Sequence, residues 1–439
     1  MKKHLIQKAV SALLLSAMLG AALPVNASAA ANDDTMIVVS LGDSYSSGEG
    51  IPQFYGQNKS WEEKIYDEDW LAHRSTKSWP GMLEIPNVSG KLKDYNVKQT
   101  NSSKCKWYFG AVSGAETRHF KKERQVKKTY KRISLFKTLK TTYNMPKQLD
   151  IFNKVSGDVD YVTLTVGGND VKFEDIITTC ATGSTYLHFG NDKLKIEKMM
   201  DELWASFDTT RANIKGVYTD VQSKAGSQAN IIVAGYPKLL DKEGKGVLIS
   251  EKEATIVNQN VTKFNNAIKS IVNECRGQGM NIHFVDVEAE FDKDGGHQAY
   301  SDNAWINNII LLKQSEDLDQ SGIGSAYSVH PNEEGAKAYA RCVNAKIKEI
   351  ENAKNKKSVK SIKSSARILD AEPVIETVTE YVPKLEVSGK LADAVVEETT
   401  TTEAVTVNED EITTVAAETT TAAADEIVAE DEVLVKEAG

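Results

Sequence analysis

The chain has 439 residues, of which 41% are hydrophobic and 26% are charged, with only 9 prolines. This composition is ordinary for a globular protein and excludes a collagen, a coiled coil and a polytopic membrane protein. At about 150 residues per domain, the length allows two or three domains, or one large domain with extensions. The net charge of −9 is unevenly spread, because residues 371–439 carry −15 and residues 1–370 therefore carry +6. The acidic balance thus belongs to the tail and does not exclude an acidic partner for the core.

The first 29 residues predict a secretory signal peptide. A basic start precedes an apolar stretch from Ala9 to Leu23, and Ala27-Ser28-Ala29 supplies a cleavage site of small residues. The apolar stretch is shorter than the roughly 20 residues that span a bilayer, which disfavours a membrane anchor. No later run is long and apolar enough to span. We therefore expect a secreted, extracellular protein with no transmembrane segment.

Export makes disulfide bonds possible. The chain has four cysteines, Cys105, Cys180, Cys275 and Cys342, and none of them forms a C-x-x-C pair or lies beside a histidine at zinc spacing. Four cysteines permit three pairings, between which the sequence does not choose. We expect one or two structural bridges, with four buried free thiols as the alternative.

Four short apolar runs are rich in β-branched residues, and most of them end in a turn signal: Met36–Leu41, Val159–Val166, Ile231–Ala234 and Ile282–Val287. Near-continuous apolar runs predict strands of a sheet that is buried on both faces. Helical patterns lie between them, at 195–224 and 251–277, and a last helix is expected over Asn332–Ile350. Strands that alternate with helices predict an α/β fold with a parallel sheet covered by helices on both faces.

A strongly basic segment interrupts this pattern. Residues 118–147 hold eleven Lys and Arg against one Glu, a net charge of +10, and we expect a helical insertion there. The segment is either a solvated surface or an electrostatic patch for an anionic polymer, a phospholipid surface or the chain's own acidic tail. Export and the lack of a recognisable nucleic-acid motif argue against nucleic acid as a partner.

The composition shifts again from about Asn355. Residues 354–370 are predicted to form a basic linker. Residues 371–439 are rich in Thr, Glu, Ala and Val. Few aromatic residues and a high net charge cannot support a packed core, which predicts a disordered tail. A weak strand-rich module within 372–396 is the alternative. The expected organisation is a signal peptide at 1–29, one domain at 30–353 that includes the basic insertion, the linker and the tail.

Three segments carry candidate chemistry, and the first is Gly42-Asp43-Ser44-Tyr45-Ser46-Ser47-Gly48-Glu49-Gly50. It follows directly on the first predicted strand, and open parallel sheets bind ligands beyond the carboxyl ends of their strands. The amide of Ser44 can face a substrate there and its hydroxyl can be a nucleophile. The alternative is a phosphate-binding loop, but its Gly-x-x-x-x-Gly-Lys-Ser/Thr motif is absent.

The other two segments supply a donor and a base. Gly167-Gly168-Asn169-Asp170 follows the second predicted strand, where the amide of Asn169 could donate to a developing oxyanion, although a plain turn is the alternative. Ser328-Val329-His330-Pro331-Asn332 precedes the last helix, and histidine is the usual base for a serine nucleophile. The alternative for His330 is an ordinary surface or core histidine, and His297 is the other histidine of interest.

In this order the three segments resemble those of the SGNH/GDSL hydrolases, and the form GDSYSSGEG is similar to that of their secreted lipase/esterase branch. Shorter matches extend the resemblance over about residues 36–350: His73-Arg74-Ser75, Val112-Ser113-Gly114-Ala115, Gly235-Tyr236-Pro237 and Phe284-Val285-Asp286-Val287. The resemblance implies that Ser44 is the nucleophile, that His330 is the general base, and that Ser44, Gly114 and Asn169 form the oxyanion hole. It also implies a three-layer α/β/α sandwich with a five-stranded parallel sheet in flavodoxin-like order.

The sequence departs from the family at the residue that orients the histidine. Many members have Asp three residues before the His, and this chain has Tyr327 there. Similarity to some secreted members implies that the Tyr327 carbonyl orients His330, with Asp317 or Asp319 as alternatives. Residues 317–322 begin like a calcium loop, but its twelfth position is Ser328 instead of Glu. We expect neither a metal nor a cofactor.

These expectations describe a secreted serine esterase or lipase that cleaves carboxylic esters through an acyl-enzyme. Fold and catalytic residues do not decide among lipids, acetylated sugars, thioesters and aromatic esters. The branch that the sequence resembles favours lipid or acyl esters, and carbohydrate deacetylation on the same site is the alternative. A non-catalytic surface-binding protein is an alternative of another class, against which the combination of Ser44, Asn169 and His330 argues.

Overall fold

The computed structural model describes residues 35–134, 137–181, 195–245, 249–318 and 324–369. The chain divides into one compact unit up to Lys357 and a second unit from Ser358 onward. The fold and the candidate site described below belong to the first unit. The expected signal peptide at 1–29 and the tail at 371–439 lie outside the described residues.

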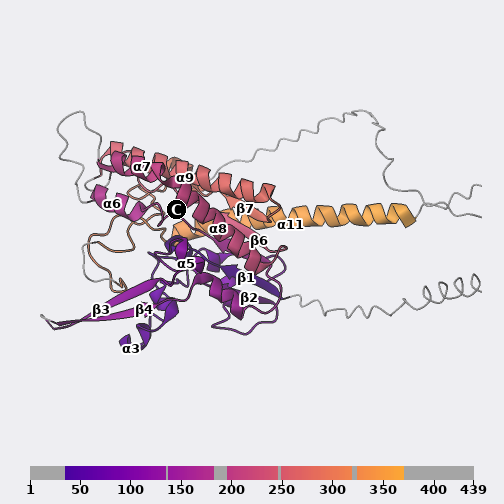
Figure 1. The fold of residues 1–439 in the computed structure, drawn as a ribbon, viewed down its shortest axis with the longest axis horizontal. Helices are drawn as coiled ribbons and strands as arrows, with labels where there is room; N and C mark the ends of the chain where they lie inside the picture. Colours follow the sequence, from indigo (N-terminus) through magenta and orange to yellow (C-terminus); the bar gives the residue numbers. More distant parts are fainter. Residues whose placement is uncertain (1–34, 135–136, 182–194, 246–248, 319–323, 370–439) are drawn as a thin grey trace, which may run out of the picture. The chain divides into compact units, whose positions relative to one another are not determined.

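A five-stranded sheet forms the centre of the first unit (Figure 1). Its strands are β1 (Met36–Ser40), β2 (Cys105–Phe109), β5 (Tyr161–Leu164), β6 (Asn230–Ala234) and β7 (Ile282–Val285). The order across the sheet is β2-β1-β5-β6-β7, and every neighbouring pair is parallel. This is the flavodoxin-like order that the family resemblance implied.

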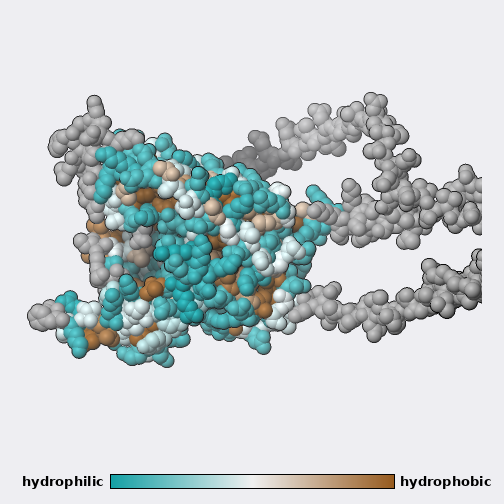
Figure 2. All heavy atoms as spheres, in the orientation of Figure 1, coloured by the Kyte–Doolittle hydropathy of each residue, from teal (hydrophilic) through white to brown (hydrophobic). Residues whose placement is uncertain are grey.

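The burial of the strands shows that helices cover both faces of the sheet. Side chains alternate between the two faces of a strand, and every residue of β5 and β6 is buried. The α/β sandwich expected from the near-continuous apolar runs is therefore confirmed. The view in Figure 2 shows a largely hydrophilic exterior over this core.

The helices differ widely in length. They are α2 (Ser44–Ser47), α3 (Trp61–Lys64), α4 (Glu68–Leu71), α5 (Arg118–Lys121), α6 (Phe173–Ala181), α7 (Lys195–Ala205), α8 (Phe207–Ala225), α9 (Glu251–Gly277), α10 (Glu288–Phe291) and α11 (Glu333–Leu369). Helix α9 begins with a capping box. The Ser250 side chain accepts from the backbone amide of Glu253, and the Glu253 carboxylate accepts from the backbone amide of Ser250. Helix α11 passes the predicted end at Ile350, because no Gly or Pro interrupts residues 336–369.

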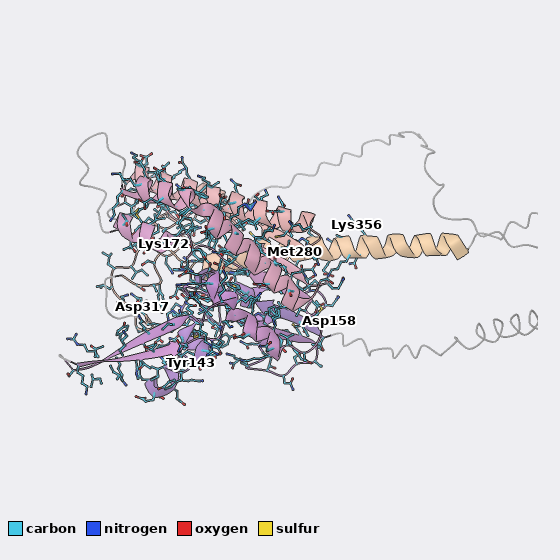
Figure 3. All side chains as sticks on the ribbon, viewed as in Figure 1. Tyr143, Asp158, Lys172, Met280, Asp317 and Lys356 are labelled. Atoms are coloured by element: carbon cyan, nitrogen blue, oxygen red, sulfur yellow. The ribbon has the colours of Figure 1, made fainter. Side chains whose placement is uncertain are left out.

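The basic insertion is a β-hairpin, so the expectation of a helical insertion was wrong. Strand β3 (Val126–Ser134) pairs antiparallel with β4 (Lys137–Asn144), and among the described residues of the segment only those of α5 are helical. The segment also contains many threonines, tyrosines and branched aliphatic residues, which favour strands and which its charge obscured. The hairpin forms a two-stranded sheet of its own, with Tyr143 near its base (Figure 3).

All four cysteines are free in the structure, and the expectation of one or two disulfides was therefore wrong. They lie on four different elements, β2, α6, α9 and α11, and three of them are fully buried. Burial raises the pKa of the Cys105 and Cys180 thiols to about 12. These cysteines act as small apolar core residues.

Candidate functional site

The candidate site lies at the point where the order of the strands reverses. Strands β1 and β5 are neighbours in the sheet, although β2 lies between them in the sequence and at the sheet edge. The carboxyl ends of parallel strands lie at the same edge, and ligands bind at such switch points. Ser44 follows β1 and Gly167 follows β5, and the Asp43 amide donates to the Thr165 carbonyl over 3.2 Å.

Glycine 42 allows the chain to turn sharply from β1 into the short helix α2. Its φ is +126°, and a Cβ at this position would lie 2.6 Å from the Thr165 carbonyl oxygen. Any other residue would clash there and strain the backbone. The turn makes Ser44 the first residue of α2, with Asp43 as the N-cap that accepts from the Tyr45 amide. Ser44 keeps 7% of its surface exposed.

The carboxylate of Asp43 links this turn to the rest of the site. It accepts hydrogen bonds from the hydroxyls of Thr165 and Tyr236, at 2.6 and 2.5 Å. Burial raises the pKa of Asp43 above its ordinary value, although these hydrogen bonds oppose the rise. The Tyr236 hydroxyl also accepts from the Gly168 amide over 3.2 Å. Asp43 and Tyr236 therefore connect the segment after β1 to the segment after β5.

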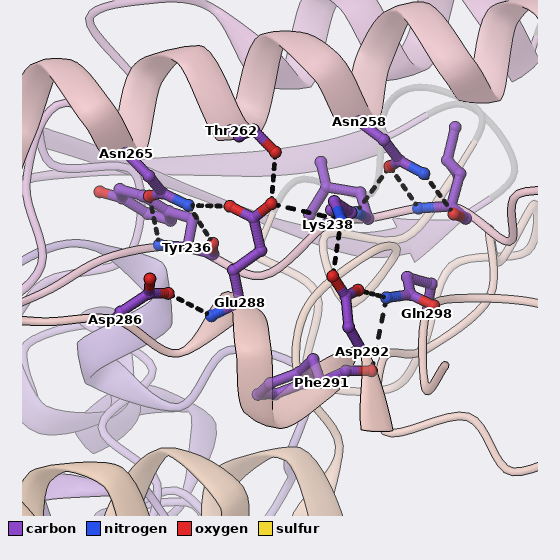
Figure 4. Close-up of polar contacts among 12 residues, drawn as sticks. Tyr236, Lys238, Asn258, Thr262, Asn265, Asp286, Glu288, Phe291, Asp292 and Gln298 are labelled. Carbon is purple, nitrogen blue, oxygen red and sulfur yellow. Dashed lines mark hydrogen bonds and ion pairs between the residues drawn. The ribbon is translucent and has the colours of Figure 1, made fainter. Parts of the chain in front are cut away.

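Tyr236 is itself fixed from helix α9 (Figure 4). The Asn265 side chain accepts from the Tyr236 amide over 2.9 Å and donates to the Tyr236 carbonyl over 2.7 Å. It also donates to Glu288, which accepts from Thr262 as well. An asparagine side chain on α9 thus determines where the hydroxyl that bonds Asp43 lies.

The loop that carries Gly114 is attached to the same turn. The Val112 amide donates to the Gly42 carbonyl over 2.9 Å. The Ser113 carbonyl accepts from Gln125 Nε2 and Lys127 Nζ, at 2.8 and 2.6 Å. Because a trans peptide group is planar, the N–H of Gly114 points away from that carbonyl. The φ of Gly114 is +73°, a conformation that favours glycine.

Asn169 and Asp170 connect the third segment to this loop. The Asn169 side-chain amide donates to the Ala115 carbonyl over 2.9 Å, which leaves its second hydrogen for another acceptor. The Asp170 carboxylate accepts from the amide and the hydroxyl of Thr117. Among the residues that the structure describes, none accepts from the amide of Ser44 or Gly114. The loops of Ser44, Gly114 and Asn169 are thus joined, and each retains an N–H for a ligand.

His330 packs against the segment 44–50 near both of its ends, at Tyr45 and at Gly50. Its ring lies 5.2 Å from the ring of Tyr45, centroid to centroid, and the Tyr45 hydroxyl donates to the Val329 carbonyl. At the other end, a Cβ on Gly50 would lie 3.1 Å from the Cβ of His330. The structure therefore brings His330 to the Ser44 segment, as the sequence predicted.

The orienting group of His330 is the Ser328 carbonyl, 3.0 Å from Nδ1, so the expectation of Tyr327 was wrong by one residue. Val329 has a φ of +53°, which turns the preceding carbonyl back toward the ring. The Tyr327 carbonyl accepts from the His330 amide and the Asn307 side chain, both at 3.4 Å. A carbonyl only accepts, so Nδ1 carries a proton, and in the neutral imidazole Nε2 is then the acceptor.

The alternative carboxylates do not take this role. Asp317 accepts from the amides of Gln314 and Ala326, at 2.6 and 2.9 Å, and so closes its own loop. Asp319 lies outside the described residues. Within the described part of the chain, no carboxylate is hydrogen-bonded to His330 and no group of His, Cys, Asp and Glu side chains could hold a metal ion.

A sequence model of the family described as GDSL-like lipase/acylhydrolase matches residues 38–343. The chain belongs to this family. It is 25% identical over 340 residues to a lipase of Streptomyces rimosus, covering 76% of this chain and 96% of the relative. It is 24% identical over 330 residues to Lipase 1 of Streptomyces coelicolor, covering 74% and 96%. The predicted family is therefore confirmed, and with it ester hydrolysis.

Solved structures of two Streptomyces enzymes are among those that resemble the chain. The extracellular lipase of Streptomyces rimosus has a TM-score of 0.46 at 24% identity, covering 71% of this chain and 99% of that one. Phospholipase A1 of Streptomyces albidoflavus NA297 has a TM-score of 0.44 at 22% identity, with the same coverage.

A buried ion pair beside the site of this lipase/acylhydrolase was not predicted. Both carboxylate oxygens of Glu49 lie within 2.8 Å of His73 Nδ1, and both side chains are almost fully buried. Phe54 stacks on the His73 ring at 4.4 Å. Glu49 belongs to the GDSYSSGEG segment and His73 to the His73-Arg74-Ser75 motif, but their separation of 24 residues concealed the pairing. Burial alone would raise the pKa of Glu49, but the charge and the hydrogen bond of His73, with smaller contributions from His330 and Ser113, together outweigh burial and lower the pKa to about 2.

This pair should make the lipase/acylhydrolase sensitive to acid. A carboxyl group whose pKa is lowered by folding stabilises the native state above its unfolded pKa, and this contribution is lost as the pH falls through the folded value. From the ordinary value of 4.5 to about 2, the loss for Glu49 is on the order of 3 kcal/mol. Urea unfolding at several pH values between 5 and 2 should show it, and Glu49→Gln should flatten the curve.

The exposed Glu84 provides a matched control for this measurement. Glu84→Gln should leave the pH dependence of the free energy of unfolding as it is in the parent. An equally steep loss in Glu49→Gln and in the parent would show that the Glu49–His73 pair does not carry the acid sensitivity.

Proposed function

We propose that this protein is a secreted serine esterase or lipase that hydrolyses carboxylic esters through an acyl-enzyme on Ser44. The observation that carries the proposal is the joining of four segments at the switch point of the sheet. Hydrogen bonds attach the loops of Gly114 and Asn169 to the Ser44 turn, and His330 packs against the same turn with its Nδ1 held by the Ser328 carbonyl.

Acylation would use these groups in order. The Ser44 hydroxyl attacks the ester carbonyl carbon while Nε2 of His330 takes its proton. The negative charge that forms on the carbonyl oxygen is bound by the amides of Ser44 and Gly114 and by the free N–H of Asn169. Collapse of this intermediate breaks the bond to the alcohol oxygen, which takes the proton from His330. Water, deprotonated by His330, then releases the acid and regenerates Ser44.

The Ser328 carbonyl orients the imidazole but provides no full negative charge. A carbonyl dipole should therefore stabilise the imidazolium that forms during catalysis less than a carboxylate would.

A lipid or another acyl ester is the proposed substrate class. The curated relatives from two Streptomyces species are both called lipases, and the similarity to this chain covers nearly the whole length of each relative. Deacetylation of a glycan uses the same chemistry and is the second candidate. The family assignment disfavours a protein that only binds surfaces.

Secretion is part of the proposal and rests on residues 1–29, together with the extracellular relative. Across the described ranges, no helix combines the length and the apolar character needed to cross a membrane.

The test is the hydrolysis of p-nitrophenyl esters from acetyl to palmitoyl by the chain from residue 30 onward. A maximum at medium or long acyl chains supports a lipase, and a maximum at acetyl redirects the proposal to deacetylation. A fluorophosphonate should add one equivalent of mass to the peptide that contains Ser44. Labelling elsewhere, or no hydrolysis of any ester, would contradict the proposal.

A further inference from the structure

The β3–β4 hairpin extends from the body of the molecule (Figure 1) and presents two different faces. Its inner face leans on α3 and α4. There Lys131 lies 3.3 Å from the Glu62 carboxylate and 5.5 Å from the centre of the Trp61 ring. Tyr143, opposite Lys127 in the ladder, donates to Glu68 over 3.2 Å. These contacts fix the orientation of the hairpin and leave the other face outward.

The outer face is basic. Side chains alternate between faces along a strand, so Lys128 and Arg132 of β3 share a face with Lys140 of β4, which pairs with Tyr130. All three basic side chains are exposed, and the Lys140 ammonium lies 5.8 Å from the centre of the Tyr130 ring. Among the residues that the structure describes, no carboxylate pairs with Lys128 or Lys140.

Apolar side chains accompany these charges. Val126, which is 50% exposed, shares the face of Lys128, and Ile133, which is 55% exposed, lies at the bulge that follows Arg132. Leu139, which is 44% exposed, lies opposite Lys131 and so belongs to the inner face. Figure 2 shows hydrophobic residues among hydrophilic ones at the end of the molecule where the hairpin lies. Exposed apolar residues beside basic ones are typical of surfaces that bind anionic lipid.

We propose that the outer face of the hairpin docks on an anionic phospholipid surface and so seats the enzyme on its substrate. This inference rests on the proposed function as a lipase. The headgroups offer negative charge to Lys128, Arg132 and Lys140, and the layer beneath them accepts Val126 and Ile133. An anionic polymer would satisfy the charges but would leave the aliphatic side chains in water, and for this reason a lipid surface fits better.

The docking face is connected to the candidate oxyanion loop. Gln125 and Lys127, at the base of β3, are the two residues that donate to the Ser113 carbonyl. The Met145 amide, just past β4, donates in turn to the Gln125 carbonyl over 2.8 Å. The strand that carries Lys128 and Arg132 therefore begins at the groups that fix the peptide of Gly114.

The test measures vesicle binding apart from hydrolysis, in a Ser44→Ala background. The probes are vesicles of phosphatidylcholine with about 30% phosphatidylglycerol and vesicles of phosphatidylcholine alone. Lys128→Gln, Arg132→Gln and Lys140→Gln together should weaken binding to the anionic vesicles at least tenfold, since each basic residue near such a surface contributes about fivefold. Salt at 0.5 M should have a similar effect on the parent.

A matched control removes three exposed lysines elsewhere, by Lys224→Gln, Lys269→Gln and Lys348→Gln, and should bind as the parent does. Val126→Ser with Ile133→Ser should also weaken binding to the anionic vesicles severalfold. Equal binding by the hairpin and control triples would overturn the docking proposal. Binding to heparin but not to vesicles would overturn it too, by assigning the hairpin to an anionic polymer.

Failure of docking and failure of the proposed function are distinguishable. With Ser44 present, the hairpin triple should hydrolyse a short water-soluble ester at the parent rate, within about twofold, but should lose at least tenfold on anionic phospholipid vesicles. An equal loss on both substrates would overturn the docking role. A parent that binds vesicles but hydrolyses no ester would support docking and contradict the esterase.

Discussion

Ser44→Ala and His330→Ala should each lower kcat on a chromogenic ester by about 10⁴-fold to 10⁶-fold, and the double variant should lose no more than the worse single variant. Without its base the hydroxyl is a poor nucleophile, and without the hydroxyl the base has no proton to take. The two side chains act as one unit, so their effects do not add. Rates for the four proteins of this cycle give the coupling directly.

Substitutions of a serine and a histidine outside the site serve as controls. Ser227 is exposed, and His283 on β7 is half-buried with its own contact to Asn281. Ser227→Ala and His283→Gln should both retain the parent rate. If the losses at Ser44 and His330 multiplied in the double variant, the two residues would not form a nucleophile and its base.

Asn169→Ala should lower kcat by about 10²-fold to 10³-fold with little change in KM. The proposed hydrogen bond from Asn169 forms fully only when charge develops on the ester oxygen, so its loss affects the transition state more than the bound substrate. Asn169→Asp should be at least as damaging, because a carboxylate would repel that charge. Steady-state kinetics on one ester separates the two parameters.

The Asn169 side chain also donates to the Ala115 carbonyl, so its removal affects the loop as well as the chemistry. Thermal unfolding of each variant distinguishes these effects, and the exposed Asn153→Ala should change neither stability nor rate. A rise in KM at unchanged kcat would mean that Asn169 only contributes to substrate binding.

The sequence predicted those parts of the fold that depend on local pattern. Four of the five strands were found because buried parallel strands are apolar along their length. Strand β2 was missed because Lys106 leaves only the three residues Trp107, Tyr108 and Phe109 as a continuous apolar run within it. The hairpin was taken for a helix because the basic residues of the segment 118–147 masked the strand-forming residues between them.

The site was predictable to the level of segments but not of individual contacts. Gly42, Ser44 and Asn169 follow strands that the sequence places at one edge of the sheet, and their proximity follows from parallel pairing. The carbonyl that orients His330 depends on the positive φ of Val329, which valine rarely adopts and no pattern reveals. The Glu49–His73 pair likewise exists only once the chain between them has folded.

The absence of bonds between the four cysteines has a consequence for how the protein reaches its native state. No oxidising catalyst is needed to complete the fold, and no wrong pairing has to be corrected. The native structure is then equally accessible in a reducing cytosol and outside the cell. The export that we propose would then require folding in the cytosol to be delayed by other means, since a reducing environment alone would not prevent it.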